Sequence, residues 1–452
     1  MKIDALVAEI GSTTTIVNAF SLNPAEFLGQ GVAPTTVLQG DVAIGLKAAK
    51  ADLQRNLGLG ELRTARFLAT SSAAGGLRMT VHGLVYDMTV KAGREAALGA
   101  GANIVLATAG KLENIDLGDI EAASPNLILL SGGTDYGDRE VALYNSELLL
   151  QLKVSLPPVI YCGNVQNQAA IKEKFAKAGK TLYITENVYP RLDELNIEPV
   201  RRLIHRAFEE HITAAPGMES IRKIVDGAIM PTPGAVMDAA AILREIRGDL
   251  VVIDVGGATT DIHSVTDGCE EVAAMQIAPE PRAKRTVEGD LGLFVNARNL
   301  AESVGLDLLE RELGFNPEPI FRDYNAIPAT PEQAELAVRL AYHAAARAIA
   351  RHAGHLRHSY SPKGRQTHAF GKDLTAVKFL VATGGALTRL PQAPEIMSEL
   401  AKINTNSIML FPKFDNLKIL TDSKYIMASL GVLSREFPGE ARDLLEKYVR
   451  EA

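Results

Sequence analysis

The sequence predicts an α/β protein built from two related halves, and two repeated features lead to this prediction. EIGSTTT at residues 9–15 and DVGGATTD at residues 254–261 share an acid, a glycine, a small residue and paired threonines. Their acids, Glu9 and Asp254, lie 245 positions apart (254 minus 9). Each motif interrupts two short apolar stretches, a pattern typical of a β-hairpin whose turn carries the motif.

The second repeated feature is a strand that ends in a hydroxyl residue and two glycines. LILLSGGTDYG at 127–137 and KFLVATGGALTRL at 378–390 have this pattern, and Ser131 and Thr383 lie 252 positions apart (383 minus 131). Because both feature pairs repeat at nearly the same offset, an internal duplication is favoured over chance.

Helical segments are expected between the strands, which completes the α/β pattern. They cover residues 87–98, 164–178, 199–212 and 331–356. Proline and glycine gather between residues 214 and 235, where the chain is expected to pass from one half to the other. We therefore predict an N-terminal lobe at 1–215 and a C-terminal lobe at 216–452, with a cleft between them.

Composition narrows the class of protein. A chain of 452 residues with 47% apolar and 22% charged residues can bury a large core. The formal charge of −7 and the absence of tryptophan argue against a nucleic-acid partner. No apolar run approaches the length of a membrane span and no signal peptide is recognisable, so we expect a cytoplasmic protein without a membrane partner.

The two threonine-rich motifs suit the binding of a polyphosphate. A turn that presents successive backbone N–H groups must let a phosphate approach closely, which glycine and small hydroxyl residues allow. The first turn consists of Gly11, Ser12, Thr13 and Thr14, and the second of Gly256, Gly257, Ala258, Thr259 and Thr260. Two facing turns, one from each half, would hold the phosphates across the cleft.

Acids accompany both turns. Glu9 and Asp254 precede them and Asp261 follows the second. A carboxylate beside a phosphate requires a cation, so Glu9 and Asp254 predict Mg²⁺, held directly or through its water molecules. The same acids could orient a water molecule for phosphoryl transfer. The turn at Thr383, Gly384, Gly385 and Ala386 has no acid and suits the close approach of a nucleoside.

Each of these motifs also has a purely structural interpretation as a tight turn. Three histidines, His352, His355 and His358, could be written as a metal cluster, but cations near a helix C-terminus are an ordinary complement of the helix dipole. The roles of Glu288 and Asp290 in RAKRTVEGDLG stay open between a nucleotide contact and a solvated loop.

Taken together, EIGSTTT, DVGGATTD and VATGGAL resemble the two phosphate motifs and the adenosine motif of the superfamily of actin, Hsp70 chaperones and sugar kinases. TSSAAGGLRM, LLSGGTDYGD and TVEGDLG further resemble the glutamate mutase accessory family MutL/GlmL, over nearly the whole chain. The resemblance implies a duplicated actin-like ATPase fold, related to ribonuclease H, with two lobes around a nucleotide cleft.

The resemblance also implies an activity. Members of that family would use ATP, ADP and Mg²⁺ to reactivate an adenosylcobalamin-dependent mutase, such as glutamate mutase or an aminomutase, by exchanging damaged cobalamin. By motif position, Glu9, Asp254 and Asp261 would organise Mg²⁺ and water, and Gly384 and Gly385 would lie against the adenosine. Glu9 departs from the superfamily, which mostly has aspartate there.

Three other functions remain open from the sequence. A small-molecule kinase of the same superfamily would need an aspartate base for a substrate hydroxyl. An activase of 2-hydroxyacyl-CoA dehydratases would need cluster-binding cysteines, whereas Cys162 and Cys269 are isolated. A non-hydrolysing scaffold would only dock a mutase. The mutase served, the partner surface and the oligomeric state, including a homodimer, are also open.

Overall fold

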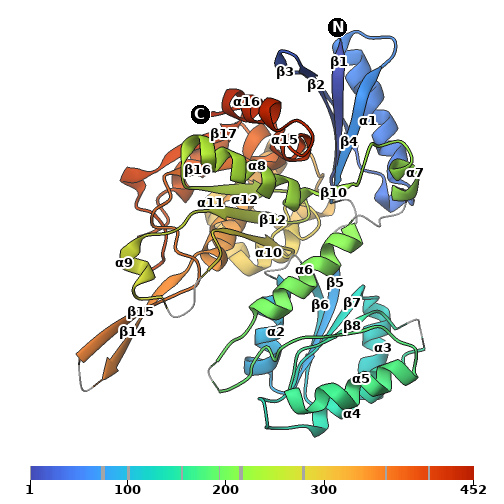
Figure 1. The fold of residues 1–452 in the computed structure, drawn as a ribbon, viewed down its shortest axis with the longest axis vertical. Coiled ribbons are helices and arrows are strands. Elements are labelled where there is room, and N and C mark those ends of the chain that lie inside the picture. Colours follow the sequence, from blue (N-terminus) through green and yellow to red (C-terminus); the bar gives the residue numbers. More distant parts are fainter. Residues whose placement is uncertain are drawn as a thin grey trace. The chain divides into compact units, whose positions relative to one another are not determined.

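The computed structural model describes residues 2–72, 77–98, 102–153, 156–192, 194–212, 217–276, 280–361, 364–405 and 408–451. The chain forms two compact units. Unit 1 comprises residues 1–75, 212–287 and 291–452, and unit 2 comprises residues 76–211 and 288–290. Figure 1 shows the chain coloured from blue at the N-terminus to red at the C-terminus.

Unit 1 contains two sheets with the same strand order, which confirms the predicted duplication. The first sheet has the order β3-β2-β1-β4-β10 and the second begins with β13-β12-β11-β16-β17, followed by β18. In both, the first two strands of the repeat are antiparallel and the first and fourth are parallel. This is the order expected of the actin-like, ribonuclease H-related fold.

The strands of the first sheet are β1 (Ile3–Ile10), β2 (Thr14–Leu22), β3 (Ala25–Pro34), β4 (Thr64–Ser71) and β10 (Met230–Pro231). Those of the second sheet are β11 (Leu250–Val255), β12 (Thr260–Val265), β13 (Ala283–Glu288), β16 (Phe379–Thr383), β17 (Lys418–Asp422) and β18 (Val449–Glu451). Because β10 still belongs to the first sheet, the change of sheet lies after Pro231. The division of the lobes at residue 215 stays a prediction.

Helices cover both faces of these two sheets. They are α1 (Val42–Leu57), α7 (Met218–Arg222), α8 (Thr232–Arg247), α9 (Glu270–Ala273), α10 (Ala297–Val304), α11 (Leu306–Leu313), α12 (Pro331–His352), α13 (Gly384–Arg389), α14 (Ala393–Leu400), α15 (Met427–Leu433) and α16 (Pro438–Tyr448). One core joins α8, α15 and α16 to both sheets, and it includes Val7, Phe20 and Val252. A second core packs the opposite face of the second sheet against α10 to α14, and a third packs α1 and α7 on the first sheet.

Unit 2 is an insertion between β4 and β10 that the sequence analysis did not separate from the first lobe. Its sheet has the order β6-β5-β7-β8-β9 and is entirely parallel. The strands are β5 (Leu77–Gly83), β6 (Ala102–Ala109), β7 (Leu127–Leu130), β8 (Val159–Tyr161) and β9 (Leu182–Ile184), and the helices are α2 (Lys91–Leu98), α3 (Asn114–Ala123), α4 (Glu140–Leu149), α5 (Gln168–Lys177) and α6 (Glu198–Ile212).

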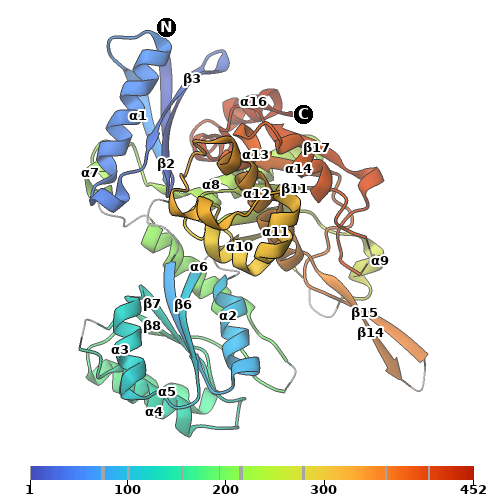
Figure 2. The same cartoon turned by 180° about the vertical axis from the view of Figure 1, so that it is seen from behind.

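Alternation along β7 explains why unit 2 carries helices on both faces of its sheet, as Figure 2 shows. Ile128 and Leu130 point into the core shared with α3, α4 and α5. Leu129 points to the other face, where a Cβ built on Gly93 of α2 would lie 3.0 Å from its side chain. Such alternation is the period of two that a strand imposes.

The expected helices are confirmed, with one difference at a helix end. The segments 87–98, 164–178 and 199–212 correspond to α2, α5 and α6, with short turns added at the first two starts. α12 ends at His352 instead of residue 356, because the chain turns at Gly354 into the hairpin of β14 (His355–Ser361) and β15 (Gly364–Phe370). A Cβ on Gly354 would lie 2.4 Å from the carbonyl oxygen of Phe370, so the backbones approach closely there.

Candidate functional site

The first threonine-rich motif forms the turn between β1 and β2. The Gly11 N–H donates to the Thr14 carbonyl oxygen at 3.0 Å, and a Cβ on Gly11 would lie 2.6 Å from that oxygen. Ser12 Oγ donates to the Ser72 carbonyl at 2.6 Å, which ties the turn to the end of β4. A larger residue at position 11 would break the turn, so glycine is required there.

The second motif forms the same turn between β11 and β12. The Gly256 N–H donates to the Thr259 carbonyl oxygen at 2.9 Å, as Gly11 does to Thr14 245 positions earlier. The Gly257 carbonyl accepts from the N–H groups of Phe294 and Val295 at 2.8 and 2.9 Å. Ala258 is buried behind the turn. Both predicted hairpins are therefore confirmed, together with the position of the motif in each turn.

The two turns lie against each other. A Cβ built on Gly257 would meet Thr13 Cγ2 at 2.7 Å and Thr13 Oγ1 at 2.8 Å. Thr13 belongs to the first half of unit 1 and Gly257 to the second, so residues 244 positions apart (257 minus 13) face each other without room for one more carbon atom. The threonine hydroxyl and the backbone of the glycine-rich turn form one continuous surface.

The third motif lies beside the second. Gly384 begins α13 with φ of 82°, and a Cβ there would lie 2.4 Å from Asp254 Oδ1. Both the positive φ and the close approach demand glycine. Gly385, by contrast, has no atom within 4 Å of the place its Cβ would occupy, and Ala386 is partly buried against the core of the second sheet.

The three predicted acids, Glu9, Asp254 and Asp261, lie on β1, β11 and β12. Asp254 lies opposite Thr383 in the parallel pair β11–β16 and opposite Asp261 in the antiparallel pair β11–β12. Asp254 is half-buried, whereas Glu9 and Asp261 are each only 5% exposed. The negative charges of Asp254 and Glu9 act on each other, so these two acids lie within electrostatic reach.

A further acid, Asp422, belongs to this cluster and was missed by the sequence analysis. It ends β17, is fully buried and accepts hydrogen bonds from Thr383 Oγ1 at 3.1 Å and from the Met427 N–H at 2.8 Å. The motif KILTD that carries it has no glycine turn, so only its place at the end of a strand beside β16 could have indicated it. Three carboxylates from β1, β11 and β17 thus gather at one end of the two sheets.

Burial and mutual repulsion raise the pKa values of these acids. Burial is the largest cause for Glu9, whose pKa rises to about 7 with the charges of Asp422 and Asp254 adding to it. Burial also raises the pKa of Asp254 to about 7, again with Asp422 contributing. The pKa of Asp422 is raised by burial as well, against the hydrogen bonds from Ile426 and Met427. Carboxylates held this close favour either a shared proton or a bound cation.

Glu9 is held by a chain of hydrogen bonds that links the two halves of unit 1. Its Oε1 accepts from the Ser429 N–H at 3.1 Å, from the Ser429 hydroxyl and from Asn18 Nδ2 at 3.1 Å. Gln30 donates to Asn18 Oδ1 at 2.8 Å, and Arg389 of α13 donates to Gln30 Oε1 at 2.5 Å. The helix that begins with Gly384 is thereby connected to the acid of the first turn.

The predicted pairing of Ser131 with Thr383 is wrong, because the strands before them, β7 and β16, belong to sheets of different topology in unit 2 and unit 1. Ser131 follows β7 in unit 2, where its hydroxyl donates to the carbonyls of His82 and Thr89, both at 3.2 Å. The true counterpart of Thr383 is Thr70, since Glu9 lies opposite Thr70 as Asp254 lies opposite Thr383. The duplicated strand is therefore β4, and TSSAAGG replaces the TGGAL of the second half; Ala73–Gly76 lie outside the described residues.

The three histidines lie on different elements of the structure. His352 ends α12, is buried and bonds Thr286 Oγ1 at 3.0 Å and Ser264 Oγ at 2.8 Å. His355 and His358 lie on β14 instead. Within the described ranges, no group of three or more histidine, cysteine, aspartate or glutamate side chains has the geometry of a metal site.

Glu288 is buried at the end of β13, and Asp290 follows it.

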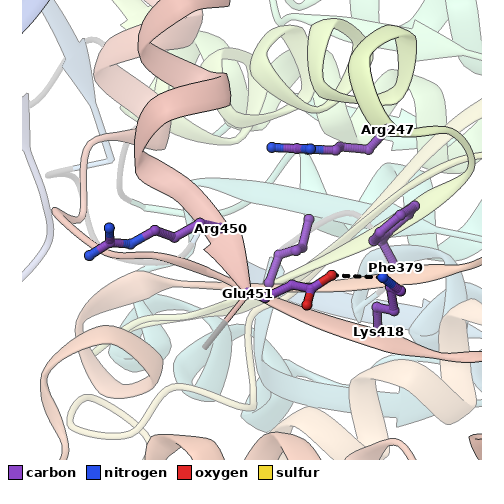
Figure 3. Close-up of a pocket in the computed structure, with 6 residues that line it drawn as sticks. Arg247, Phe379, Lys418, Arg450 and Glu451 are labelled. Atoms are coloured by element: carbon purple, nitrogen blue, oxygen red, sulfur yellow. Dashed lines mark hydrogen bonds and ion pairs between the residues drawn. The ribbon is translucent and has the colours of Figure 1, made fainter.

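A cavity of about 240 Å³ lies elsewhere on unit 1, as Figure 3 shows. It is lined by Arg247, Phe379, Lys418, Leu420, Arg450 and Glu451. Phe379 and Lys418 begin β16 and β17, whereas Thr383 and Asp422 end them. The cavity thus lies at the opposite ends of the strands from the motifs, and the ion pair between Lys418 and Glu451 at 2.8 Å borders it.

Comparisons with known proteins agree with the motifs. A family model described as MutL protein matches residues 5–449. Protein MutL of Clostridium tetanomorphum is 35% identical over 459 residues, which covers 98% of each chain. In the described part of the chain, no helix combines the length and hydropathy that a membrane crossing requires.

Two solved structures are similar at much lower levels. A glycerol dehydratase reactivase is 11% identical, with a TM-score of 0.34 over 95% of this chain and 99% of that one. A diol dehydratase-reactivating factor in nucleotide-free form is 10% identical, with a TM-score of 0.35 over 97% and 100%. These values are too low to support an inference about function. The family model and the 35% identical relative, which both extend over nearly the whole chain, show that this chain belongs to the MutL protein family.

Proposed function

We propose that this chain binds and hydrolyses ATP and serves as an accessory, reactivating protein of an adenosylcobalamin-dependent mutase. The observation that carries the ATP site is the contact of the two glycine-rich turns, Thr13 against Gly257, beside the carboxylates of Glu9 and Asp254. The partner class comes from the family, whose resemblance implies glutamate mutase or an aminomutase.

Different groups of the chain would bind the phosphates, the adenosine and Mg²⁺. Backbone N–H groups and hydroxyls of the turns at Ser12–Thr14 and Gly257–Thr259 would donate to phosphate oxygens, and the open space at Gly385 would admit the adenosine. Burial, with the neighbouring negative charges adding to it, raises the pKa values of Glu9 and Asp254, and a cation such as Mg²⁺ would favour their charged forms. When bound, Mg²⁺ would neutralise phosphate charge; Glu9 and Asp254 would hold it, directly or through water.

Among the acids, Asp254 is the best placed to orient a water molecule. It is half-buried and its pKa lies near 7, where a group can both accept and release a proton. The Glu9 carboxylate accepts hydrogen bonds from Ser429 and Asn18, so its proposed role is to position the first turn and to bind the metal. Asp261 lies opposite Asp254 and completes the negative surface.

The experiment measures release of phosphate from ATP with Mg²⁺ by the wild type, by Asp254→Asn and by Asp415→Asn. Asp415 is exposed, so its substitution makes the same chemical change outside the site. We expect Asp254→Asn to abolish turnover with the fold intact, and Asp415→Asn to behave as wild type. Normal turnover in Asp254→Asn would refute the site.

The partner is tested in the same assay by additions. Turnover that ignores sugars and rises with a cobalamin-inactivated mutase supports the reactivating role. Turnover that requires a small hydroxylated substrate would make the protein a kinase, and tight ATP binding without turnover would make it a scaffold.

A further inference from the structure

The β14–β15 hairpin is a projecting, positively charged arm on an acidic protein. Both views show it extending away from the rest of unit 1 (Figures 1 and 2). From His355 to Phe370 the sequence holds two arginines, one lysine and three histidines, and no aspartate or glutamate. The whole chain has a formal charge of −7, so the other residues carry −10 (−7 minus +3). The arm therefore differs in net charge from the rest of the chain taken as a whole.

The base of the arm is firmly attached. Leu356 and Ala369 pack with Val272 and Leu410 in a small core of their own. The Leu356 N–H donates to the Ile408 carbonyl at 2.8 Å, and the Ala369 N–H donates to the Met275 carbonyl at 2.9 Å. The arm is thus presented in a fixed direction from unit 1.

Beyond this base, the described contacts of the hairpin are mainly those of its own ladder. The strands pair from His355 opposite Phe370 to Ser361 opposite Gly364. Arg357, His358, Arg365 and Gln366 are all exposed. An isolated two-stranded hairpin is only marginally stable in water, so an arm of this kind gains from a surface that covers it.

The described contacts of Arg357 and Arg365 are with imidazole and aromatic rings. Arg357 Nε donates to the His355 ring at 2.8 Å, and its guanidinium lies 5.0 Å from the centre of the Phe370 ring. Arg365 Nη2 donates to the His358 ring at 2.6 Å. Among the described contacts, both arginines bond imidazoles and neither bonds a carboxylate. Because Arg357 and Arg365 belong to cross-strand pairs of opposite parity, one lies on each face of the ladder.

We propose that this arm docks into an acidic face of a partner protein, with carboxylates of the partner pairing with Arg357 and Arg365. Guanidinium groups bind carboxylates in a bidentate manner, and the charge would steer the encounter between two proteins. The inference rests on the proposed function only in taking the mutase as that partner. A nucleic acid is disfavoured, since the −10 on the remainder of the chain would repel phosphates.

The test compares three proteins: the wild type, the variant Arg357→Glu with Arg365→Glu, and the control Arg63→Glu with Arg191→Glu. The control makes the same change in net charge at side chains that are 86% and 83% exposed and lie outside the arm. Binding to the cobalamin-inactivated mutase is measured at low and high salt, together with basal and mutase-stimulated ATP turnover.

We expect the arm variant to bind the mutase at least about tenfold more weakly, with a flatter salt dependence, while basal turnover is unchanged. The control should bind as the wild type does. Equal binding and stimulation in all three proteins would overturn the arm and leave the proposed function standing. A wild type that neither binds nor responds to the mutase would overturn the proposed function and the arm with it. RNA binding that is lost only in the arm variant would also overturn the protein-docking assignment.

Discussion

Glu9, at the end of β1, accepts hydrogen bonds from both the backbone N–H and the hydroxyl of Ser429 in α15, a residue 420 positions later. The motif around Glu9 predicts a place beside a metal and a phosphate, where related sequences mostly have aspartate. The structure gives a physical reason for the longer side chain, because its carboxylate reaches across to the second half of unit 1. The acid of the first turn is therefore also a link between the repeats.

Replacing Ser429 by alanine should destabilise the protein and lower ATP turnover. The variant removes a hydrogen bond to a buried carboxylate, which costs about 1–3 kcal/mol in unfolding free energy. Urea unfolding and phosphate release are the measurements. Ser434→Ala is the control, since the Ser434 hydroxyl donates only to the Gly431 carbonyl of its own helix end. Equal losses in the two variants would contradict the importance of the Glu9 contact.

A double-mutant cycle tests whether the length of Glu9 serves this contact. Glu9→Asp withdraws the carboxylate by about one methylene, so it should lose the hydrogen bond from the Ser429 hydroxyl that Ser429→Ala also removes. The losses in unfolding free energy should then fail to add in the double variant. Additive losses would mean that Glu9 and Ser429 act separately.

The two glycines of the third motif should respond differently to alanine. Gly384→Ala places a methyl group 2.4 Å from Asp254 Oδ1 at a positive φ, so we expect a loss of more than about 1 kcal/mol and weaker ATP binding. Gly385→Ala meets no atom within 4 Å and should fold like the wild type. Thermal unfolding and calorimetric titration with ATP distinguish the two. Equal Tm values for both variants would show that the backbone can relax at Gly384.

The clustered acids predict that stability falls as pH rises. The pKa values of Glu9 and Asp254 are about 7 in the folded protein, above the ordinary values of 4.5 and 3.8. From about pH 4 to about pH 7 the unfolded chain has lost protons that the native state still holds, so deprotonation favours unfolding in this window. Asp422→Asn removes a charge that raises both pKa values, and it should flatten the profile. Urea unfolding across the window, without Mg²⁺, is the measurement; an unchanged slope in Asp422→Asn would contradict the coupling.

Unit 2 should show the opposite dependence because of His82. Its ring is buried between Thr108 and Thr80, at 2.8 and 2.9 Å, and burial lowers its pKa from 6.5 to about 3. Below about pH 6.5, His82 of the unfolded chain binds a proton, whereas the buried ring of the native protein stays neutral. The stability of unit 2 is therefore reduced as the pH falls toward about 3. Hydrogen exchange in β5 and β6 over this range measures it. Protection that does not change on acidification would argue against a neutral, buried His82.

The sequence was most informative where a motif must be glycine. Close backbone approach requires glycine at Gly11 and Gly384, and Gly256 repeats the turn hydrogen bond of Gly11, so the hairpins and the duplication could be predicted from these positions. Asp422 and Ser429 could not, because they reach the site through packing of β17 and α15 and carry no local signal. The pairing of Ser131 with Thr383 was wrong for a related reason. A parallel strand that ends in a hydroxyl residue and two glycines occurs both in unit 2 and in the second half of unit 1, and only the hydrogen bonding between strands shows that the two belong to different sheets.

The β14–β15 hairpin was missed because helical spacing continues through the end of α12 in HAAARAIARHAGHLRH. The close approach at Gly354 is a tertiary effect, which overrides the local pattern. Unit 2 was missed because the stretch rich in proline and glycine at 214–235, which follows its end, was interpreted as the passage between the two halves.

The core that joins α8, α15 and α16 to both sheets has a consequence for the order of synthesis on the ribosome. Ala5, Val7, Phe20 and Leu68 of the first sheet are covered in part by α16, through Leu444 and Leu445, near the end of the chain. The first sheet is synthesised early, but one of its apolar faces can be covered completely only after almost the entire chain has left the exit tunnel. Such distant contacts slow folding and leave nascent chains prone to aggregation. Clipping the last helix should thus harm the earliest-made strands, although they lie at the other end of the sequence.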